Sequence, residues 1–136
     1  MKIILFLFLL NSQIGFTQND LDSSLHVNIE YVDFPDVEAR FPGDSTAFFV
    51  YLSKELMEAQ RDESWPTTYN GPIYFQFIVL ANGSIANIQI VRGDNSTINN
   101  IIIDLLENMP DWIPANIDEK PVNSRIFSHI SINNCH

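Results

Sequence analysis

The sequence predicts an α+β fold, in which two helices cover one face of a three-stranded antiparallel or mixed sheet in a two-layer domain. Three observations lead to this prediction: a hairpin pattern in residues 71–93, helical periodicity on both sides of it, and an alternating strand pattern near the C-terminus. The expected order is helix, strand, strand, helix, strand, and such an order is typical of a domain in which helices and sheet form separate layers.

The hairpin is expected in residues 71–93, which read GPIYFQFIVLANGSIANIQIVRG. The Asn82-Gly83 pair predicts a two-residue type I′ turn, because both central positions of that turn need a positive φ. With this turn the apolar face pairs Phe75 with Ile90, Phe77 with Ile88 and Val79 with Ala86. The other face, which includes Gln76 opposite Gln89, is mixed, so one face of the hairpin must be covered.

A first helix is predicted over residues 45–60, after the turn at Phe41-Pro42-Gly43. Asp44 or Ser45 can cap it. Its apolar residues recur at helical spacing and define the side that should face the sheet. They are Phe48, Leu52, Leu56 and Ala59, with Phe49 beside them.

A second helix is predicted from a cap at Asn95, Ser96 or Thr97 to the break at Pro110. Its apolar positions recur at intervals of three and four residues, as on the buried side of a helix. They are Ile98, Ile101, Ile102, Leu105, Leu106 and Met109.

The last strand is predicted over residues 125–133, after a loop. In it Ile126, Ser128, Ile130 and Ile132 should point to one face, and Phe127, His129 and Ser131 to the other. The second helix brings the chain back across the sheet, so this strand should run parallel to the second hairpin strand and pair beside the first. It would then form an exposed edge. Trp65 and Trp112 are expected to close the ends of the core, with an exposed aromatic patch as the alternative.

Residues 1–17 predict a secretory signal peptide. Lys2 precedes the apolar run of residues 3–10, and Gly15 and Thr17 suit a cleavage before Gln18. An uncleaved anchor is the alternative, although the run is far shorter than the roughly 20 residues that span a bilayer. We therefore expect a leader segment over residues 18–36, with a weak strand signal, a domain over residues 37–133 and a tail over residues 134–136. The chain is therefore expected to be exported, without a membrane span after cleavage.

The composition argues against several functional classes. The chain carries a net charge of −10, which disfavours nucleic acid and anionic membranes as partners. Its only cysteine is Cys135, so it cannot close an internal disulfide. His26, His129 and His136 lack the spacing of metal ligands. No Ser-His-Asp or Cys-His arrangement can be argued, since Cys135-His136 lies in the tail and has no orienting third group. We therefore predict no metal, no cofactor and no enzymatic activity.

An ordered set of short motifs resembles the C-terminal domain of TonB, the energy transducer of bacterial outer-membrane import, in the version found in Bacteroidetes-like bacteria. The resemblance spans about residues 37–132. Its motifs are Glu38-Ala39-Arg40-Phe41-Pro42-Gly43, Phe77-Ile78-Val79 before Asn82-Gly83-Ser84-Ile85, Ile90-Val91-Arg92-Gly93, Met109-Pro110-Asp111-Trp112-Ile113-Pro114-Ala115 and Lys120-Pro121-Val122.

The resemblance implies a protein-interaction domain that binds a short extended peptide, the TonB box of an outer-membrane transporter, beside the last strand. Carried over by position, the binding strand is Arg125, Ile126, Phe127, Ser128, His129, Ile130 and Ser131. Arg125 would pair with an acidic residue of the peptide. Transducers of this family also have a membrane anchor and a Pro-rich spacer. We expect neither here, and therefore expect an accessory role in transport in the periplasm, with secretion as the less favoured location. The alternative is that the leader segment or a second copy of the chain covers the same edge, as in a self-associating scaffold or homodimer.

Overall fold

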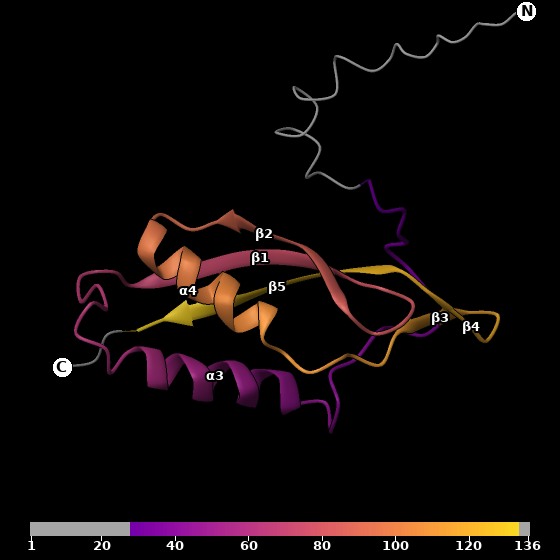
Figure 1. Cartoon of the computed structure of the whole chain (residues 1–136), viewed down its shortest axis with the longest axis horizontal. Helices are drawn as coiled ribbons and strands as arrows, with labels where there is room; N and C mark the ends of the chain where they lie inside the picture. The colour runs from indigo at the N-terminus through magenta and orange to yellow at the C-terminus, as the bar shows by residue number, and fades with distance from the viewer. Residues whose placement is uncertain (1–27, 134–136) are drawn as a thin grey trace, which may run out of the picture.

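The structure is a computed structural model that describes residues 28–133 (Figure 1). Its helices are α3 (Ala47–Ala59) and α4 (Ser96–Glu107), and its strands are β1 (Gly71–Val79), β2 (Ile85–Arg92), β3 (Ala115–Ile117), β4 (Lys120–Val122) and β5 (Ser124–Ile132). The fold class is α+β, as predicted. The expected signal peptide, the first part of the leader segment and the residues His26, Cys135 and His136 lie outside the described residues.

The main sheet has the predicted topology. Its strand order is β2-β1-β5, and β1 lies in the centre, antiparallel to both neighbours. The pairing of β1 with β5 is unbroken over the full length of both strands, from Gly71 opposite Ile132 to Val79 opposite Ser124. β5 therefore lies at one edge of the sheet, where the sequence placed it.

The hairpin loop differs from the prediction. The N–H of Leu80 donates to the carbonyl of Ser84 (2.8 Å), and the N–H of Gly83 donates to the carbonyl of Leu80 (2.8 Å). The loop is therefore three residues long, and only Gly83 in it has a positive φ, of 92°. The Asn82 side chain accepts from the N–H of Ser84 (2.9 Å), which favours a local Asx-turn over the left-handed conformation that a type I′ turn needs. The prediction of a type I′ turn at Asn82-Gly83 was wrong.

A bulge in β2 restores part of the predicted register. The longer loop places Val79 opposite Ile85 and Ile78 opposite Ala86, one residue away from the predicted pairs. Asn87, with a φ of 51°, lies where the register then shifts. Beyond the shift, Phe75 faces Ile90 and Gln76 faces Gln89, as predicted. An extra residue in one strand accounts for this recovery.

The core lies between the sheet and the two helices. Ile73, Phe75, Phe77 and Val79 of β1 are fully buried, and α3 and α4 lie along the sheet (Figure 1). The predicted helical stripes are confirmed by the buried residues Phe48, Leu52 and Leu56 in α3 and Ile98, Ile102 and Leu106 in α4. Phe49, expected beside the first stripe, is instead 53% exposed. Burial of one such side chain stabilises the fold by about 1.5–3 kcal/mol.

Both tryptophans belong to this core. Trp65 is 5% exposed and Trp112 is 6% exposed, so they close the core and form no exposed aromatic patch. The indole of Trp112 packs against the rings of Phe41, Phe48 and Phe77, with centroid distances of 5.7, 5.0 and 5.3 Å. The turn after α4 is thereby fixed against both the start of α3 and the sheet.

Residues 115–122, predicted as a loop, form a second small hairpin from β3 and β4. Its two turn residues, Asp118 and Glu119, have φ values of 50° and 65°. These are the positive values of a two-residue type I′ turn. The N–H of Asp118 also donates to the Asp36 carboxylate (2.9 Å), a contact between residues far apart in the sequence.

Within residues 28–133, neither helix is long and apolar enough to cross a membrane.

Candidate functional site

The β5 strand presents two different faces, as its alternating sequence predicts. Its even-numbered residues lie on the side of the helices, where Ile126 and Ile130 pack against the core. Ser128 lies opposite Phe75 on the same side. The odd-numbered residues Arg125, Phe127, His129 and Ser131 lie on the open face of the sheet. Of the seven residues predicted to bind a peptide, these four have side chains that a ligand can reach from the open face.

Among residues 28–133, little pairs with the outer edge of β5. The N–H of Arg125 donates to the carbonyl of Val32 (3.1 Å), so the backbone groups of Arg125 point away from β1. Backbone groups alternate in direction along an antiparallel strand. Those of Phe127, His129 and Ser131 therefore also point outward, and within residues 28–133 no backbone hydrogen bond reaches them. They offer an unpaired ladder to an added strand.

The described part of the leader segment, residues 28–36, covers only the beginning of this edge. Val32 forms a single parallel bridge with Ser124, and its N–H donates to the carbonyl of Asn123 (2.9 Å). The expected edge strand is thus reduced to one bridge. Arg125, predicted to pair with an acidic residue of a bound peptide, donates from its Nε to the Asp33 carboxylate of the same chain (2.8 Å).

The open face beside the edge is aromatic. The ring of Tyr74 stacks near Phe127, with centroids 6.1 Å apart and planes at 22°, and lies 5.3 Å from the ring of His129. Phe127 is 58% exposed. Next to this group, the Gln76 amide donates to the Gln89 amide oxygen (2.8 Å). An extended segment added to β5 could therefore rest alternate side chains on Phe127 and Tyr74.

The charge of the main sheet differs from that of the chain as a whole. The chain has a net charge of −10, yet β1, β2 and β5 contain no Asp or Glu. Their only formal charges at neutral pH are those of Arg92 and Arg125. An acidic partner would meet less repulsion here than elsewhere on the molecule.

The opposite edge, at β2, is less suited to strand addition. The bulge at Asn87 interrupts its register with β1, and a second irregularity lies between the pairs of Tyr74 and Phe75. Bulges twist an edge away from a flat partner strand, and native proteins use them to prevent edge-to-edge pairing. β5 has no such interruption.

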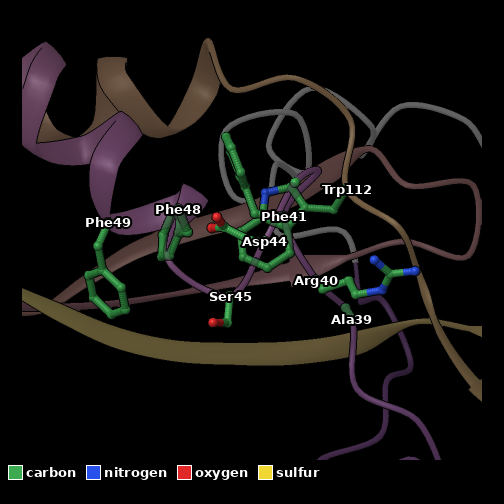
Figure 2. A pocket seen from close by; sticks show the side chains of 9 residues that line it. Ala39, Arg40, Phe41, Asp44, Ser45, Phe48, Phe49 and Trp112 are labelled. Atoms are coloured by element: carbon green, nitrogen blue, oxygen red, sulfur yellow. The ribbon is translucent and has the colours of Figure 1, made fainter.

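A separate hollow of about 420 Å³ lies where α3 begins (Figure 2). Phe41, Phe48, Phe49 and Trp112 provide most of its apolar wall. The Asp44 carboxylate at its rim accepts from the hydroxyl (2.7 Å) and the N–H (2.9 Å) of Thr46, and these hydrogen bonds lower the pKa of Asp44. Asp44 therefore fixes the backbone just before α3, whose N-cap residue is Thr46 and not the predicted Asp44 or Ser45.

The described part of the chain offers little for metal chemistry. In residues 28–133, no group of three or more His, Cys, Asp and Glu side chains lies close enough to hold a metal ion. His129 is the only one of the three histidines in this range, and its neighbours on the sheet are Tyr74 and Phe127.

Comparison with protein-family models and with curated proteins gave no match. Among solved structures, the chain is similar to the NMR solution structure of the TonB C-terminal domain of Helicobacter pylori. The two share 16% sequence identity, over 67% of this chain and 84% of the other, with a TM-score of 0.41. At this identity, the function has to be argued from the residues of the chain itself.

Proposed function

We propose that this chain is a non-enzymatic interaction module that binds an extended peptide by strand addition to the outer edge of β5. The observation that carries the proposal is the unbroken register of β5 with β1, combined with outward backbone groups at Phe127, His129 and Ser131 that have no backbone partner in the described chain. Main-chain hydrogen bonds would supply affinity, and alternate side chains would supply selectivity.

The side chains next to the edge suggest what such a peptide contains. Phe127 and Tyr74 favour an apolar or aromatic residue, because burial of aromatic surface contributes strongly to binding. Arg125 favours an acidic residue, which would compete with Asp33 for the guanidinium group. The absence of carboxylates from β1, β2 and β5 favours the same kind of partner.

The resemblance of the sequence motifs to TonB C-terminal domains suggests the source of the peptide. On this basis the ligand is the TonB box of an outer-membrane transporter, the location is the periplasm, and the chain assists transport as an accessory partner. The open edge of β5 is compatible with this ligand because strand addition needs an exposed strand several residues long.

Calorimetric titration with synthetic TonB-box peptides tests the proposal. We expect Phe127→Pro to weaken binding about fivefold, because it removes an outward N–H donor and one hydrogen bond contributes about 1 kcal/mol. The sheet should survive this change, since proline is tolerated on an edge strand where the N–H faces solvent.

Phe127→Leu is the matched control, because it keeps the N–H and an apolar side chain. It should retain most of the affinity of the unchanged protein. If the peptides do not bind the unchanged protein, or bind Phe127→Pro equally well, strand addition at β5 is wrong.

Self-association through the same edge is the second candidate. It is favoured by the exposure of Phe127 beside unpaired backbone groups, because two copies could join their β5 edges into one sheet. Sedimentation velocity over a range of concentrations distinguishes the two functions. A dimer that Phe127→Pro dissociates supports self-association, and a monomer at all concentrations excludes it.

A further inference from the structure

Residues 30–33, here called the strap, occupy the place at the start of β5 that an added peptide would take. The N–H of Val32 donates to the carbonyl of Asn123 (2.9 Å), and the N–H of Arg125 donates to the carbonyl of Val32 (3.1 Å). Val32 pairs with Ser124 and bonds to both residues that flank it, which is the pattern of a parallel ladder. The strap is thus a short parallel strand on the proposed binding edge.

The side chains of the strap engage the one cation of this edge. Asp33 accepts from Arg125 Nε (2.8 Å), and the guanidinium carbon of Arg125 lies 5.3 Å from the centre of the Tyr31 ring. The Asn123 amide adds a third contact, since its Nδ2 donates to the carbonyl of Glu30 (2.9 Å). A peptide with an acidic residue would need the same guanidinium group and the same backbone groups.

The strap is held weakly compared with the core. Tyr31 and Val32 are outside the hydrophobic core, and Tyr31 is 41% exposed. The ion pair between Asp33 and Arg125 is exposed on both sides, and such pairs contribute little. A hollow of about 280 Å³ is lined by Tyr31 and Arg125 together with Gln76 and Gln89 of the sheet.

The chain next to the strap is fixed more firmly. Val37 exchanges backbone hydrogen bonds with Asn116 (3.1 and 3.0 Å), and Arg40 exchanges them with Ile113 (2.9 and 2.8 Å). Phe34, which lies between the strap and these two backbone pairs, is 91% exposed. The strap can therefore leave β5 while the backbone pairs at Val37 and Arg40 keep it close to the strand. A segment tethered in this way competes with a free peptide at a high effective concentration.

We propose that the strap is an internal ligand of the β5 edge, which a partner segment displaces. The partner chemistry follows from the strap: an extended segment that runs parallel to β5 and carries an aromatic residue two positions before an acidic one, as Tyr31 and Asp33 do. The inference rests on the proposed function, and it adds the direction of the peptide and a built-in competitor that lowers its affinity. If the strap is closed for about 90% of the time, it weakens external binding about tenfold.

Val32→Pro tests the proposal in the full chain, because proline removes the N–H that bonds to Asn123. Phe34→Ala is the matched control, since Phe34 belongs to the same segment and is almost fully exposed. Hydrogen exchange at the Arg125 amide reports whether the strap is closed. We expect Val32→Pro to accelerate this exchange severalfold, and Phe34→Ala to leave it unchanged. Equal exchange in Val32→Pro and the unchanged protein would overturn the proposal.

The probe for binding, here called the strap peptide, is a synthetic peptide of residues 29–34, IEYVDF, which contains the strap. The control, called the lysine peptide, has lysine in place of aspartate. The strap peptide should bind Val32→Pro about tenfold more tightly than it binds the unchanged protein, and should slow exchange at Arg125 again. The lysine peptide should bind more weakly. Equal affinity of the strap peptide for the two proteins would contradict the internal competitor.

TonB-box peptides separate this inference from the proposed function. If they bind the unchanged protein and Val32→Pro equally, strand addition stands and the strap as competitor is wrong. If they bind neither protein while the strap peptide still protects Arg125 in Val32→Pro, the internal ligand stands and the transporter as its natural partner is wrong.

Discussion

Tyr51 connects the two helices through one hydrogen bond. Its hydroxyl donates to the carbonyl of Leu105 (3.0 Å), so a residue in the middle of α3 fixes the position of α4. Partial burial raises the pKa of Tyr51, and the nearby Glu55 carboxylate raises it further. Both effects favour the neutral phenol, which is the form that donates this hydrogen bond.

Tyr51→Phe should lower the free energy of unfolding by about 1 kcal/mol, the typical contribution of one such hydrogen bond. The pH dependence has a defined sign. Because the pKa is higher in the folded state, the stability is complete below the unfolded pKa of about 10 and declines as the pH rises through the folded pKa. Urea unfolding of the unchanged protein and of Tyr51→Phe, from neutral to strongly alkaline pH, measures this dependence. We expect the free energy of unfolding of Tyr51→Phe to decrease less at alkaline pH. An equal loss in both proteins would show that Tyr51 does not link stability to pH.

At the scale of elements, α4 illustrates how local chemistry decides where a helix begins. The sequence offers Asn95, Ser96 and Thr97 as caps, and the structure selects Asn95, whose side chain accepts from the N–H of Ile98 (3.0 Å). This bond satisfies one of the N–H groups that a helix leaves free at its start. It also places Ile98 at the beginning of the buried stripe.

Asn95→Ala should destabilise the domain by about 1 kcal/mol, as the loss of a side-chain cap does in other helices. Ser96→Ala is the matched control, because Ser96 lies in the first turn without capping it, and its effect should be small. Thermal unfolding followed by circular dichroism compares the two variants. A larger effect of Ser96→Ala than of Asn95→Ala would show that Asn95 is not the residue that caps α4.

The sequence predicted those elements whose pattern is local. The apolar stripes of both helices and the alternation along β5 repeat within the element itself, so they could be recognised without knowledge of the partner. The open edge followed from the topology, because the crossover placed the last strand beside the first strand of the hairpin.

The features that the sequence did not predict depend on contacts between distant residues. Gly83 lies against the turn after α4, where its carbonyl accepts from the N–H of Trp112 (2.8 Å), and an added Cβ would lie 2.4 Å from the Trp112 carbonyl oxygen. The hairpin loop is therefore shaped partly by residues 29 positions away. The β3–β4 turn likewise meets Asp36, and the strap meets Arg125. No periodicity in the sequence encodes such contacts.

At the scale of the whole molecule, the charges are distributed unevenly. The net charge of −10 comes from residues outside β1, β2 and β5, and the two ion pairs within residues 28–133 join exposed side chains. Exposed pairs contribute about 0–1 kcal/mol each. The electrostatic balance of the fold is therefore governed by repulsion among carboxylates, which opposes the compact state.

Added sodium chloride should consequently stabilise the fold. Raising the ionic strength shortens the Debye length, which is about 10 Å at 0.1 M, and screens this repulsion more than it weakens two exposed pairs. A gain of about 1 kcal/mol would raise the melting temperature of a domain of this size by roughly 4–8 °C. Glu107→Gln is the control, because Glu107 ends α4, where a negative charge also opposes the helix dipole. This variant should melt at a higher temperature at low salt and should gain less from added salt. A melting temperature that falls as salt is added would instead mean that attraction between opposite charges dominates. The ion pair between Asp33 and Arg125 would then hold the strap more firmly on β5 than the exposure of these two side chains implies.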